Sequence, residues 1–381
     1  MDISNNKPLA GIKVLELARI LAGPWAGQLL ADLGAEVIKV ERPGAGDDTR
    51  AWGPPFIEGK NGENLSSAYY HCCNRGKQTR AIDFQTPEGR DEIIALAKTS
   101  DILIENFKVG DLKKRGLDYD ALKKINSRLI YCSITGFGQN GPYAKRAGYD
   151  FMIQAMSGLM DVTGLPDGPP LKTGVAIADL FTAHYAVAGI LAALHKRHET
   201  GEGAYLDLSL LDCMVASLAN QNMNYLVSGQ SPKRLGNAHP NIVPYEAYPA
   251  SDGYIVIATG SDRQYFDLCD VLGAPELKTN PDYATNSGRV AHRAKLVPQL
   301  AAQTIKFSKA ELLERLEQKH IPAGPINTIE ELFQDPQAIA RQLRMDLPSK
   351  DAKAGSIPTV RCPIVLNGEI LSAETPSPKK A

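Results

Sequence analysis

The stretch IKVLELARILAGPWAGQLLADLGAEVIKVE (residues 12–41) decides the fold class of this chain. Residues 12–17 form a short apolar run that predicts a buried strand. Residues 22–33, opened by a Gly-Pro pair and closed by Gly34, predict a helix. Residues 35–41 (AEVIKVE) predict a second buried strand. Strand, helix and strand at this spacing predict a parallel βαβ unit.

The N-terminal half continues this alternation of apolar runs and helical segments. Further strands are predicted at 80–83, 101–105 and 128–133, and a helix with an acidic first turn at 86–98. Together these elements predict a doubly wound α/β domain.

The sequence changes in character after Tyr149. It predicts the following segments: an apolar helix at 151–160, a loop rich in Pro and Gly at 163–174, a long helix at 179–198, a short strand and then a helix at 206–227, a linker or active-site loop at 228–244, a strand at 253–258, and helices at 264–272, 287–304 and 309–319. The last strand and helices predict a second, smaller domain at roughly 230–330. The stretch 348–381 is rich in proline, so we expect few strands there and a mobile end.

The composition is that of an ordinary globular protein whose charges nearly cancel. Apolar residues make up 43% of the 381 residues, and 42 Lys and Arg face 43 Asp and Glu for a net charge of −1. Such a chain has no general attraction for nucleic acid or an anionic membrane, so we expect neither partner. The longest charge-free run, 213–232, carries Asn and Gln, and residues 1–10 are polar. We therefore expect no membrane span and no signal peptide.

The reactive side chains indicate neither a disulfide framework nor a metal site. The six cysteines include no C-x-x-C pair, which indicates free thiols and a reducing, cytoplasmic location. The seven histidines lack the spacing of a metal-ligand set, so we expect no metal.

The turn of the first βαβ unit (22–27, AGPWAG) has two glycines but not the G-x-G-x-x-G pattern of dinucleotide-binding proteins. We favour a role for these glycines in the turn and in helix packing over a nucleotide-dependent oxidoreductase. Glu41 ends the second strand where a ribose-binding acid would lie. Arg42, at the carboxyl end of that strand, is either a phosphate anchor or an ordinary solvated arginine.

Asp179 lies where an apolar, strand-like run (175–178) gives way to an apolar helix. The simpler interpretation is a helix N-cap, because an aspartate there accepts hydrogen bonds from free N–H groups. The alternative is an ionised carboxylate nucleophile, oriented by the helix dipole. Spacing alone favours the cap.

Seven segments together resemble the class III CoA-transferases, the family that contains formyl-CoA transferase and carnitine CoA-transferase. They are PLAGIKVLEL (8–17), LAGPWAGQLLADLGAEVIKVERPGAGDDTR (21–50), ENF (105–107), SITGFGQNGP (133–142), GYDFMIQAMSGLM (148–160), TGLPDGPPLKTGVAIADL (163–180) and IPAGPIN (321–327). The resemblance implies a Rossmann-like large domain and a smaller α/β domain in an interlocked homodimer. The large domain would span 1–225, completed by about 331–381, and the small domain 226–330.

The resemblance also implies the chemistry, with Asp179 as the nucleophile of the family motif G-x-x-x-[AG]-D. Its carboxylate would attack an acyl-CoA thioester, and CoA would pass to a small carboxylic acid without metal, ATP or redox cofactor. Oxyanions would be stabilised by N–H groups of the loop 236–240 (GNAHP), which contains His239. This loop lacks the glycine run of formyl-CoA transferase, so the resemblance leaves the identity of these donors open.

The resemblance implies further contacts to CoA or substrate, with Arg42 on the nucleotide phosphates. These residues are Ala22, Arg42, Ile82, Asp83, Phe84, Gln85, Asn106, Phe107, Lys108, Lys114 (or its neighbour Arg115), Gly148, Tyr149 and Asp150.

Tyr149 separates two subfamilies, because the related α-methylacyl-CoA racemases have His at that position. We therefore favour transfer over racemisation, which needs an acid–base pair. Several segments look most like the branch containing succinyl-CoA:glutarate CoA-transferase, with succinyl-CoA as the implied donor. A dicarboxylate needs a cation for its far carboxylate, and the candidates are Arg19, Arg50, Arg75 and Arg146. A CoA-binding protein without catalysis is a further alternative.

Overall fold

The computed structural model describes residues 7–380. The chain divides into two compact units, each described here by itself. The first unit takes the described residues up to Leu159, then Lys172–Gln230 and the residues from Pro336 on, and the second takes Met160–Leu171 and Ser231–Asp335. The domain limits implied by the family resemblance, 1–225 with 331–381 and 226–330, stay a prediction.

The first unit is built on a six-stranded, wholly parallel sheet with the order β5-β2-β1-β6-β7-β8. Its strands are β1 (Lys13–Glu16), β2 (Glu36–Glu41), β5 (Lys77–Ala81), β6 (Ile102–Glu105), β7 (Ile130–Thr135) and β8 (Ala204–Ser209). On one side of β1 the sheet is extended by β2 and then β5. The chain then returns to the other side of β1, where β6, β7 and β8 follow in order. The sequence therefore predicts the α/β class correctly. The direction in which strands are added to the sheet reverses between β1 and β6.

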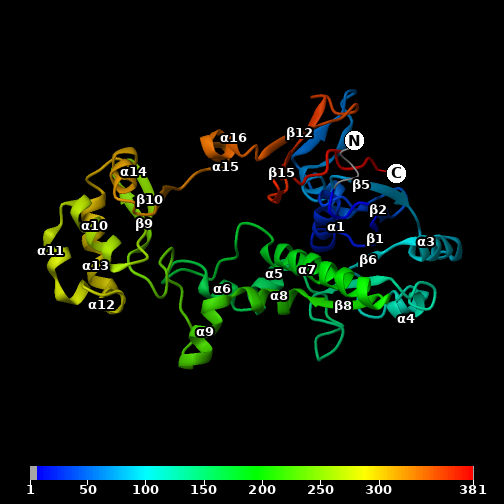
Figure 1. Cartoon of the computed structure of the whole chain (residues 1–381), viewed down its shortest axis with the longest axis horizontal. Coiled ribbons are helices and arrows are strands. Elements are labelled where there is room, and N and C mark those ends of the chain that lie inside the picture. The colour runs from blue at the N-terminus through cyan, green and yellow to red at the C-terminus, as the bar shows by residue number, and fades with distance from the viewer. Residues whose placement is uncertain (1–6, 381) are drawn as a thin grey trace. The chain divides into compact units, whose positions relative to one another are not determined.

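Helices cover both faces of this sheet, and Figure 1 shows α1 and α7 to the left of the strands and α3 and α4 to the right. On one face α1 (Ala22–Asp32) and α7 (Ile177–Thr200) pack against each other over an apolar core that includes Val14 and Ile104. On the other face α3 (Pro87–Thr99) and α4 (Tyr119–Leu122) enclose a second core around Leu15 and Leu103. Burial on both faces explains why the central strands read as continuous apolar runs.

A cluster of buried charges lies beneath α1. The Lys39 ammonium contacts Glu16 at 3.0 Å and Asp47 at 2.9 Å, and Lys77 contacts Glu16 at 2.8 Å, all with fully or almost fully buried side chains. The Glu16 carboxylate fills the space in front of Gly27, where a Cβ would collide with it. The prediction that the turn glycines serve packing is thus confirmed.

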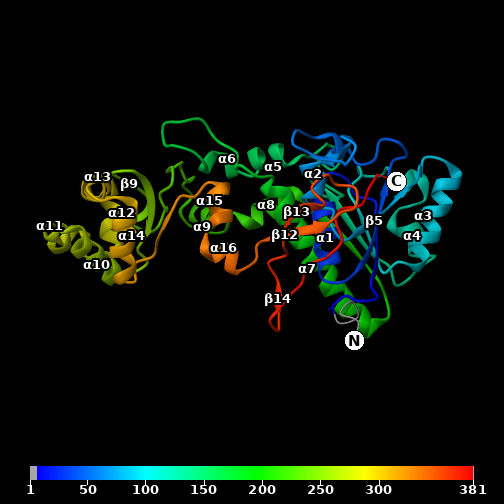
Figure 2. The ribbon, with the colours of Figure 1, turned by 90° about the horizontal axis from the view of Figure 1, so that it is seen from above.

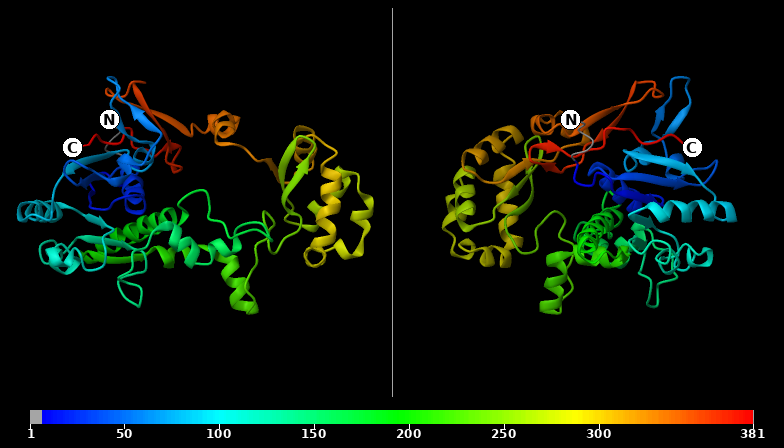
Figure 3. Two further views of the ribbon diagram at one scale, coloured as in Figure 1. Left: turned by 180° about the vertical axis from the view of Figure 1, so that it is seen from behind. Right: turned by 45° about the vertical axis from the view of Figure 1, so that its right-hand side comes forward.

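The C-terminal stretch forms two hairpins that complete the first unit, so the expectation of few strands is wrong. They pair β12 (Arg344–Pro348) with β13 (Ser356–Val360), and β14 (Val365–Leu366) with β15 (Glu369–Ile370). Figure 3 shows this orange and red segment beside the blue N-terminal strands. In the described part of the chain's end, buried Arg50 donates to the carbonyls of Pro378 and Lys379, each at 3.3 Å, and the expected mobility stays a prediction.

The second unit has a three-stranded sheet with the order β11-β10-β9, enclosed by short helices (Figure 2). Its elements are β9 (Tyr245–Ala250), β10 (Gly253–Ala258), α10 (Asp262–Leu272), α11 (Pro275–Thr279), α12 (Asn286–Ala291), α13 (Arg293–Thr304), α14 (Lys309–Gln318), β11 (Ala323–Pro325) and α15 (Ile329–Gln334), with α16 (Pro336–Ala340) following in the first unit. Tyr248, Ile255 and Leu268 contribute to its separate apolar core.

Several predicted element limits differ from the structure. The predicted helix at 206–227 is the end of β8 followed by α8 (Leu210–Ser217) and α9 (Ala219–Ser228), and the helix at 287–304 divides at His292 into α12 and α13. The predicted helix at 151–160 divides into α5 (Asp150–Met156) and α6 (Leu159–Val162). β5 lies three residues before its predicted start, because an edge strand of polar residues (KQTRA) gives little apolar signal.

Within the described residues, α7 is one helix that is long and apolar enough to cross a membrane by length and composition alone. The core helix of a globular domain passes the same test. One side of α7 is buried in the apolar core of the first unit, where Ala183, Ala186 and Ile190 lie. The charge-free run 213–232, which the sequence analysis weighed for this role, falls on the shorter α8 and α9.

Replacing Gly27 by alanine tests the buried charge cluster. The added Cβ would displace the Glu16 carboxylate from its two lysines, so we expect Gly27→Ala to lower the free energy of unfolding by about 3 kcal/mol or more. Urea denaturation followed by circular dichroism measures the change. Gly260→Ala is the control, because its Cβ would meet no heavy atom closer than 3.7 Å. Equal stability of the two variants would contradict the prediction.

Candidate active site

A cavity of about 290 Å³ opens in the first unit where the strand order reverses. Ligands of open α/β sheets bind at such a point, beyond the carboxyl ends of the strands. The cavity is lined by the segment after β1, the segment after β6, the end of β7, the loop before α5, and the starts of α7 and α8. Its residues are Arg19, Ile20, Leu21, Ala22, Asn106, Phe107, Lys108, Val109, Asp111, Ile134, Thr135, Gly136, Ala144, Arg146, Ala147, Gly148, Tyr149, Asp179 and Leu210.

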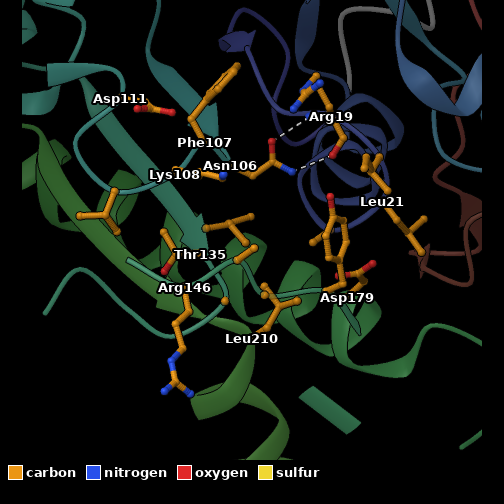
Figure 4. A pocket seen from close by; sticks show the side chains of 18 of the residues that line it. Arg19, Leu21, Asn106, Phe107, Lys108, Asp111, Thr135, Arg146, Asp179 and Leu210 are labelled. Atoms are coloured by element: carbon orange, nitrogen blue, oxygen red, sulfur yellow. Dashed lines mark hydrogen bonds between the residues drawn. The ribbon is translucent and has the colours of Figure 1, made fainter. Parts of the chain in front are cut away.

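Asp179 borders this cavity from the first turn of α7 (Figure 4). It is not the helix cap, because the cap position is Ala176, which makes no side-chain hydrogen bond. Instead the carboxylate of Asp150 accepts hydrogen bonds from the N–H of Ala178 at 2.8 Å and from that of Asp179 at 3.4 Å. The simpler interpretation of Asp179 is therefore wrong. With Asp150 serving the helix N-terminus, the Asp179 side chain is left for the cavity.

The environment of Asp179 favours its protonated form more than the sequence suggests. Burial, and then the neighbouring Asp150 carboxylate, raise the pKa of Asp179 to about 7. Protein surrounds most of the carboxyl group, although the residue keeps partial exposure through the cavity. The expectation of a fully ionised carboxylate at neutral pH thus needs correction. The helix N-terminus does not outweigh the burial and the second carboxylate.

Asp150 is itself fixed by a buried glutamine. Gln154 donates to Asp150 at 2.7 Å, and its carbonyl oxygen accepts from the Thr173 N–H at 3.0 Å. This network ties α5 to the segment before α7. Asp150 does not line the cavity and supports the start of α7, and its contact with substrate stays a prediction.

Gly148 and Tyr149 border the cavity as predicted, and Gly148 has a steric reason to be glycine. Its backbone lies directly against that of Gly136, so that a Cβ on either residue would overlap the Cα of the other. This approach brings the loop before α5 to the end of β7. Tyr149 is left 62% exposed at the cavity wall.

Asn106 joins the two segments at the reversal point. Its carbonyl oxygen accepts from the Arg19 N–H at 2.9 Å, and its amide donates to the Arg19 carbonyl at 2.7 Å (Figure 4). The predicted contacts Phe107 and Lys108 follow on the cavity wall. Phe84 does not line the cavity, but its ring packs edge-to-face on Phe107 at 5.4 Å.

A basic pair lies at the rim of the cavity. Arg19 lines the cavity and pairs with Asp48 at 2.9 Å, and the half-exposed Arg42 pairs with the other oxygen of Asp48. Two arginines share one carboxylate, so the group keeps a net positive charge. Such a group is suited to a phosphate ligand.

Comparison with known proteins identifies the family of this chain. The sequence model described as CoA-transferase family III matches residues 9–380. The chain belongs to CoA-transferase family III. It is 55% identical to the succinate–glutarate CoA-transferase of Agrobacterium fabrum over 379 residues, which cover 99% of this chain and 94% of that protein. It is 43% identical to human succinyl-CoA:glutarate CoA-transferase over 357 residues, 94% of this chain and 80% of that protein.

The fold of this family III CoA-transferase also matches solved structures. A CAIB/BAIF family protein from Brucella suis is 55% identical and superposes with a TM-score of 0.86, covering 98% of this chain and 96% of that chain. The mixed α/β fold with a parallel sheet is therefore that of the family. The predicted class of enzyme, a CoA-transferase, is confirmed.

Several predicted contacts of this CoA-transferase lie away from the cavity. Ile82 is a core residue, Asp83 accepts from the Gln85 N–H at 3.0 Å in the turn before α3, and Gln85 is exposed. Lys114 is largely exposed and pairs with Asp111, which does line the cavity. The contact of these residues with CoA stays a prediction.

Two of the four arginine candidates are excluded by buried ion pairs. Arg50 pairs with Glu41 at 2.7 Å, which also removes Glu41 from the role of ribose ligand, and Arg75 pairs with Asp32 at 2.6 Å. Arg19 and Arg146 remain at the cavity. Figure 4 shows the Arg146 guanidinium extending away from Asp179.

The sequence analysis missed some residues of the site. Thr135 ends a buried strand at the carboxyl edge of the sheet, a signal that could have identified it. Tyr69, in α2 (Ala68–His71), gives no local signal. Burial and the Asp179 carboxylate raise the pKa of Tyr69, so the two groups act on each other. His239 lies in the second unit, where its ring packs on Tyr245 at 5.1 Å.

Asp179→Asn should stabilise the protein in a pH-dependent way. The pKa of Asp179 is raised to about 7 in the folded protein from 3.8, so the stability that its proton confers is present at low pH and is lost as the pH rises to about 7. We expect the gain from Asp179→Asn to be roughly 1–2 kcal/mol larger at pH 8 than at pH 5, discounted because the group borders water.

Denaturation at the two pH values measures this difference. The control is Asp91→Asn, which removes the same charge from the exposed face of α3. A gain for Asp179→Asn that is the same at both pH values would contradict the assignment of a raised pKa.

Proposed function

We propose that this CoA-transferase moves CoA from succinyl-CoA to glutarate through covalent intermediates on Asp179. The observation that carries the proposal is the Asp179 carboxylate at the reversal-point cavity, which has no ion-pair partner among residues 7–380 and lies beside a basic rim. The names of the two relatives support this substrate pair, because each name combines succinate or succinyl-CoA with glutarate.

The reaction needs four acyl exchanges and no external energy source. The Asp179 carboxylate attacks the succinyl thioester, forming a mixed anhydride and releasing the CoA thiolate. The thiolate attacks the aspartyl carbonyl, giving an aspartyl-CoA thioester and free succinate. Glutarate then attacks this thioester to form a second anhydride and release the thiolate. Attack of the thiolate on the glutaryl carbonyl yields glutaryl-CoA and restores Asp179.

The cavity supplies several requirements of this sequence. Arg19 and Arg42 would hold CoA phosphates at the rim, and Phe107 with Phe84 would offer an apolar edge to the nucleotide. With Arg19 and Arg42 on the phosphates, Arg146 is the cavity arginine left for the far carboxylate of the acids, although its guanidinium extends away from Asp179. Anhydride and thioester both hydrolyse, so the bound acyl group must be shielded from water.

We also propose the interlocked homodimer that the family resemblance implies. Large apolar side chains are exposed on the first unit, among them Tyr185 of α7 and Leu226 and Val227 of α9, the last two at 70% and 80%. A second copy of the chain would cover such surface. Light scattering should give twice the 41.2 kDa mass of one chain, and a monomer at micromolar concentration would contradict the dimer. The cytoplasmic location stays a prediction.

Trapping the acyl-enzyme tests the proposed function. Incubation with succinyl-CoA followed by hydroxylamine should modify Asp179, because hydroxylamine attacks the activated aspartyl carbonyl. Peptide mass spectrometry locates the adduct. We expect it in the wild type and in Asp91→Asn, and not in Asp179→Ala, whose transfer to glutarate should fall at least 10³-fold.

Two outcomes would contradict the proposal. One is full transfer by Asp179→Ala. The other is α-proton exchange of an acyl-CoA in deuterated water by a wild type that shows no adduct, which would indicate racemase chemistry.

A further inference from the structure

A second cavity, of about 340 Å³, lies in the first unit beside the active-site cavity. Phe107, Lys108 and Val109, which follow β6, line both cavities. Beyond this shared segment the two differ. The active-site cavity borders the apolar core that α1 and α7 share, whereas the second cavity borders the core beneath α3 and α4 through Leu112 and Tyr131. The two cavities therefore extend toward opposite faces of the sheet.

One wall of the second cavity follows from the register of three neighbouring strands. β6, β7 and β8 pair so that Glu105, Ser133 and Asp207 lie in one row across the sheet. Tyr131 and Tyr205 are paired in the row two residues earlier, and side chains at this spacing point to the same face. A polar row and an aromatic row thus lie next to each other at the carboxyl edge of the sheet.

Tyr119 of α4 adds a third ring to this wall. Its ring stacks on that of Tyr205 with centroids 5.3 Å apart, and the Tyr131 ring lies 5.8 Å from that of Tyr205. All three tyrosines line the cavity, and Tyr205 is still 39% exposed. The wall therefore offers aromatic surface to a ligand, and a flat ring system gains most from such contact.

Glu105 is a buried acid at the cavity that the proposed acyl transfer does not use. Its Oε2 accepts from the Phe107 N–H at 2.8 Å, and it has no ion-pair partner within residues 7–380. Burial raises the pKa of Glu105 to about 7, although hydrogen bonds from Ser133 and the Phe107 N–H oppose the shift. At neutral pH the carboxyl group can therefore donate or accept a hydrogen bond. A buried acid of this kind in a cavity indicates a binding role.

Both signs of charge occur on the remaining residues of the cavity. Lys108 and Lys113 are exposed and make no ion pair with any described residue. Asp118 and Asp120, at the start of α4, line the cavity as well. Lysines bind phosphate groups, and carboxylates accept hydrogen bonds from ribose hydroxyls. The lysines disfavour a cationic ligand, and the acids disfavour a wholly apolar one.

We propose that the second cavity binds a purine nucleotide, at a site separate from the active-site cavity. The base would pack on Tyr205 and hydrogen-bond to Glu105, since a purine edge places a donor next to an acceptor. The ribose hydroxyls would contact Asp118 or Asp120, and the phosphates would contact Lys113. The inference goes beyond the proposed function and does not depend on acyl transfer at Asp179.

Calorimetric titration of ADP into the protein saturated with CoA tests this site, because CoA then occupies the active-site cavity. We expect one ADP to bind per chain under these conditions. Tyr205→Ala should weaken this binding by about tenfold or more, as the loss of a stacking partner does. The control is Tyr254→Ala, at an exposed tyrosine of β10, which should bind ADP as the wild type does. Thermal melting of each variant confirms that it is folded.

Lys113→Gln is a second variant, chosen because its exposed side chain is not needed for folding. We expect its affinity for ADP to fall about threefold. Its affinity for adenosine, which has no phosphate, should equal that of the wild type. Lys98→Gln is the matched control, because it removes the same charge from the exposed end of α3.

Three outcomes would overturn the inference. One is the absence of ADP binding to the CoA-saturated wild type. Another is equal ADP affinity in the wild type, Tyr205→Ala and Lys113→Gln, which would place the nucleotide elsewhere. The third is displacement of ADP by CoA together with weaker CoA binding in Tyr205→Ala, which would assign the cavity to the nucleotide end of CoA. The Asp179 adduct tests the proposed function separately from all three.

Discussion

The buried ion pairs beneath α1 are the constraint on which the first unit depends. Lys39 and Lys77 have no access to water, so each must face a carboxylate, and Glu16 serves both while Asp47 completes the group. Burial alone would lower the pKa of Lys39, but the two carboxylates raise it. The cluster joins β1, β2 and β5, and Lys39 also donates to the Ala18 carbonyl at 2.9 Å. It therefore fixes the segment after β1, from which the cavity wall begins.

These buried ion pairs contrast with the carboxylate that the proposed reaction uses. Glu16 is fully buried and paired with two lysines, whereas Asp179 is partly exposed and faces another carboxylate and an open cavity. The difference comes from Asp150. It accepts the hydrogen bonds from the first N–H groups of α7 that Asp179 would accept if it were the helix cap. Stability in the core and reactivity at the cavity thus come from the same chemical group in opposite surroundings.

The sequence predicts those parts of the structure that depend on neighbours along the chain. Apolar runs locate β1, β2, β6 and β7, and the resemblance locates Asp179 and the cavity segment around Asn106. It does not predict contacts between distant residues. The cap of α7 comes from Asp150, 28 residues before Ala178, and Arg50 is withdrawn from substrate binding by Glu41 and by a chain segment 328 residues away. Such pairings have no periodicity or composition to reveal them.

A raised pKa suits a carboxylate that must exchange acyl groups with a thiol. An ordinary aspartate, with a pKa near 4, is a far weaker base than a thiolate with a pKa of about 8.5, so moving an acyl group onto it from sulfur is strongly uphill. Burial beside Asp150 brings the pKa of Asp179 to about 7, which narrows this gap by about three units. At pH 7, about half of the Asp179 carboxyl groups are still ionised, so the fraction of enzyme with a reactive carboxylate falls only about twofold. In the proposed reaction, the second carboxylate therefore helps by making the first one more basic, and a positive charge placed directly beside Asp179 would slow the transfer.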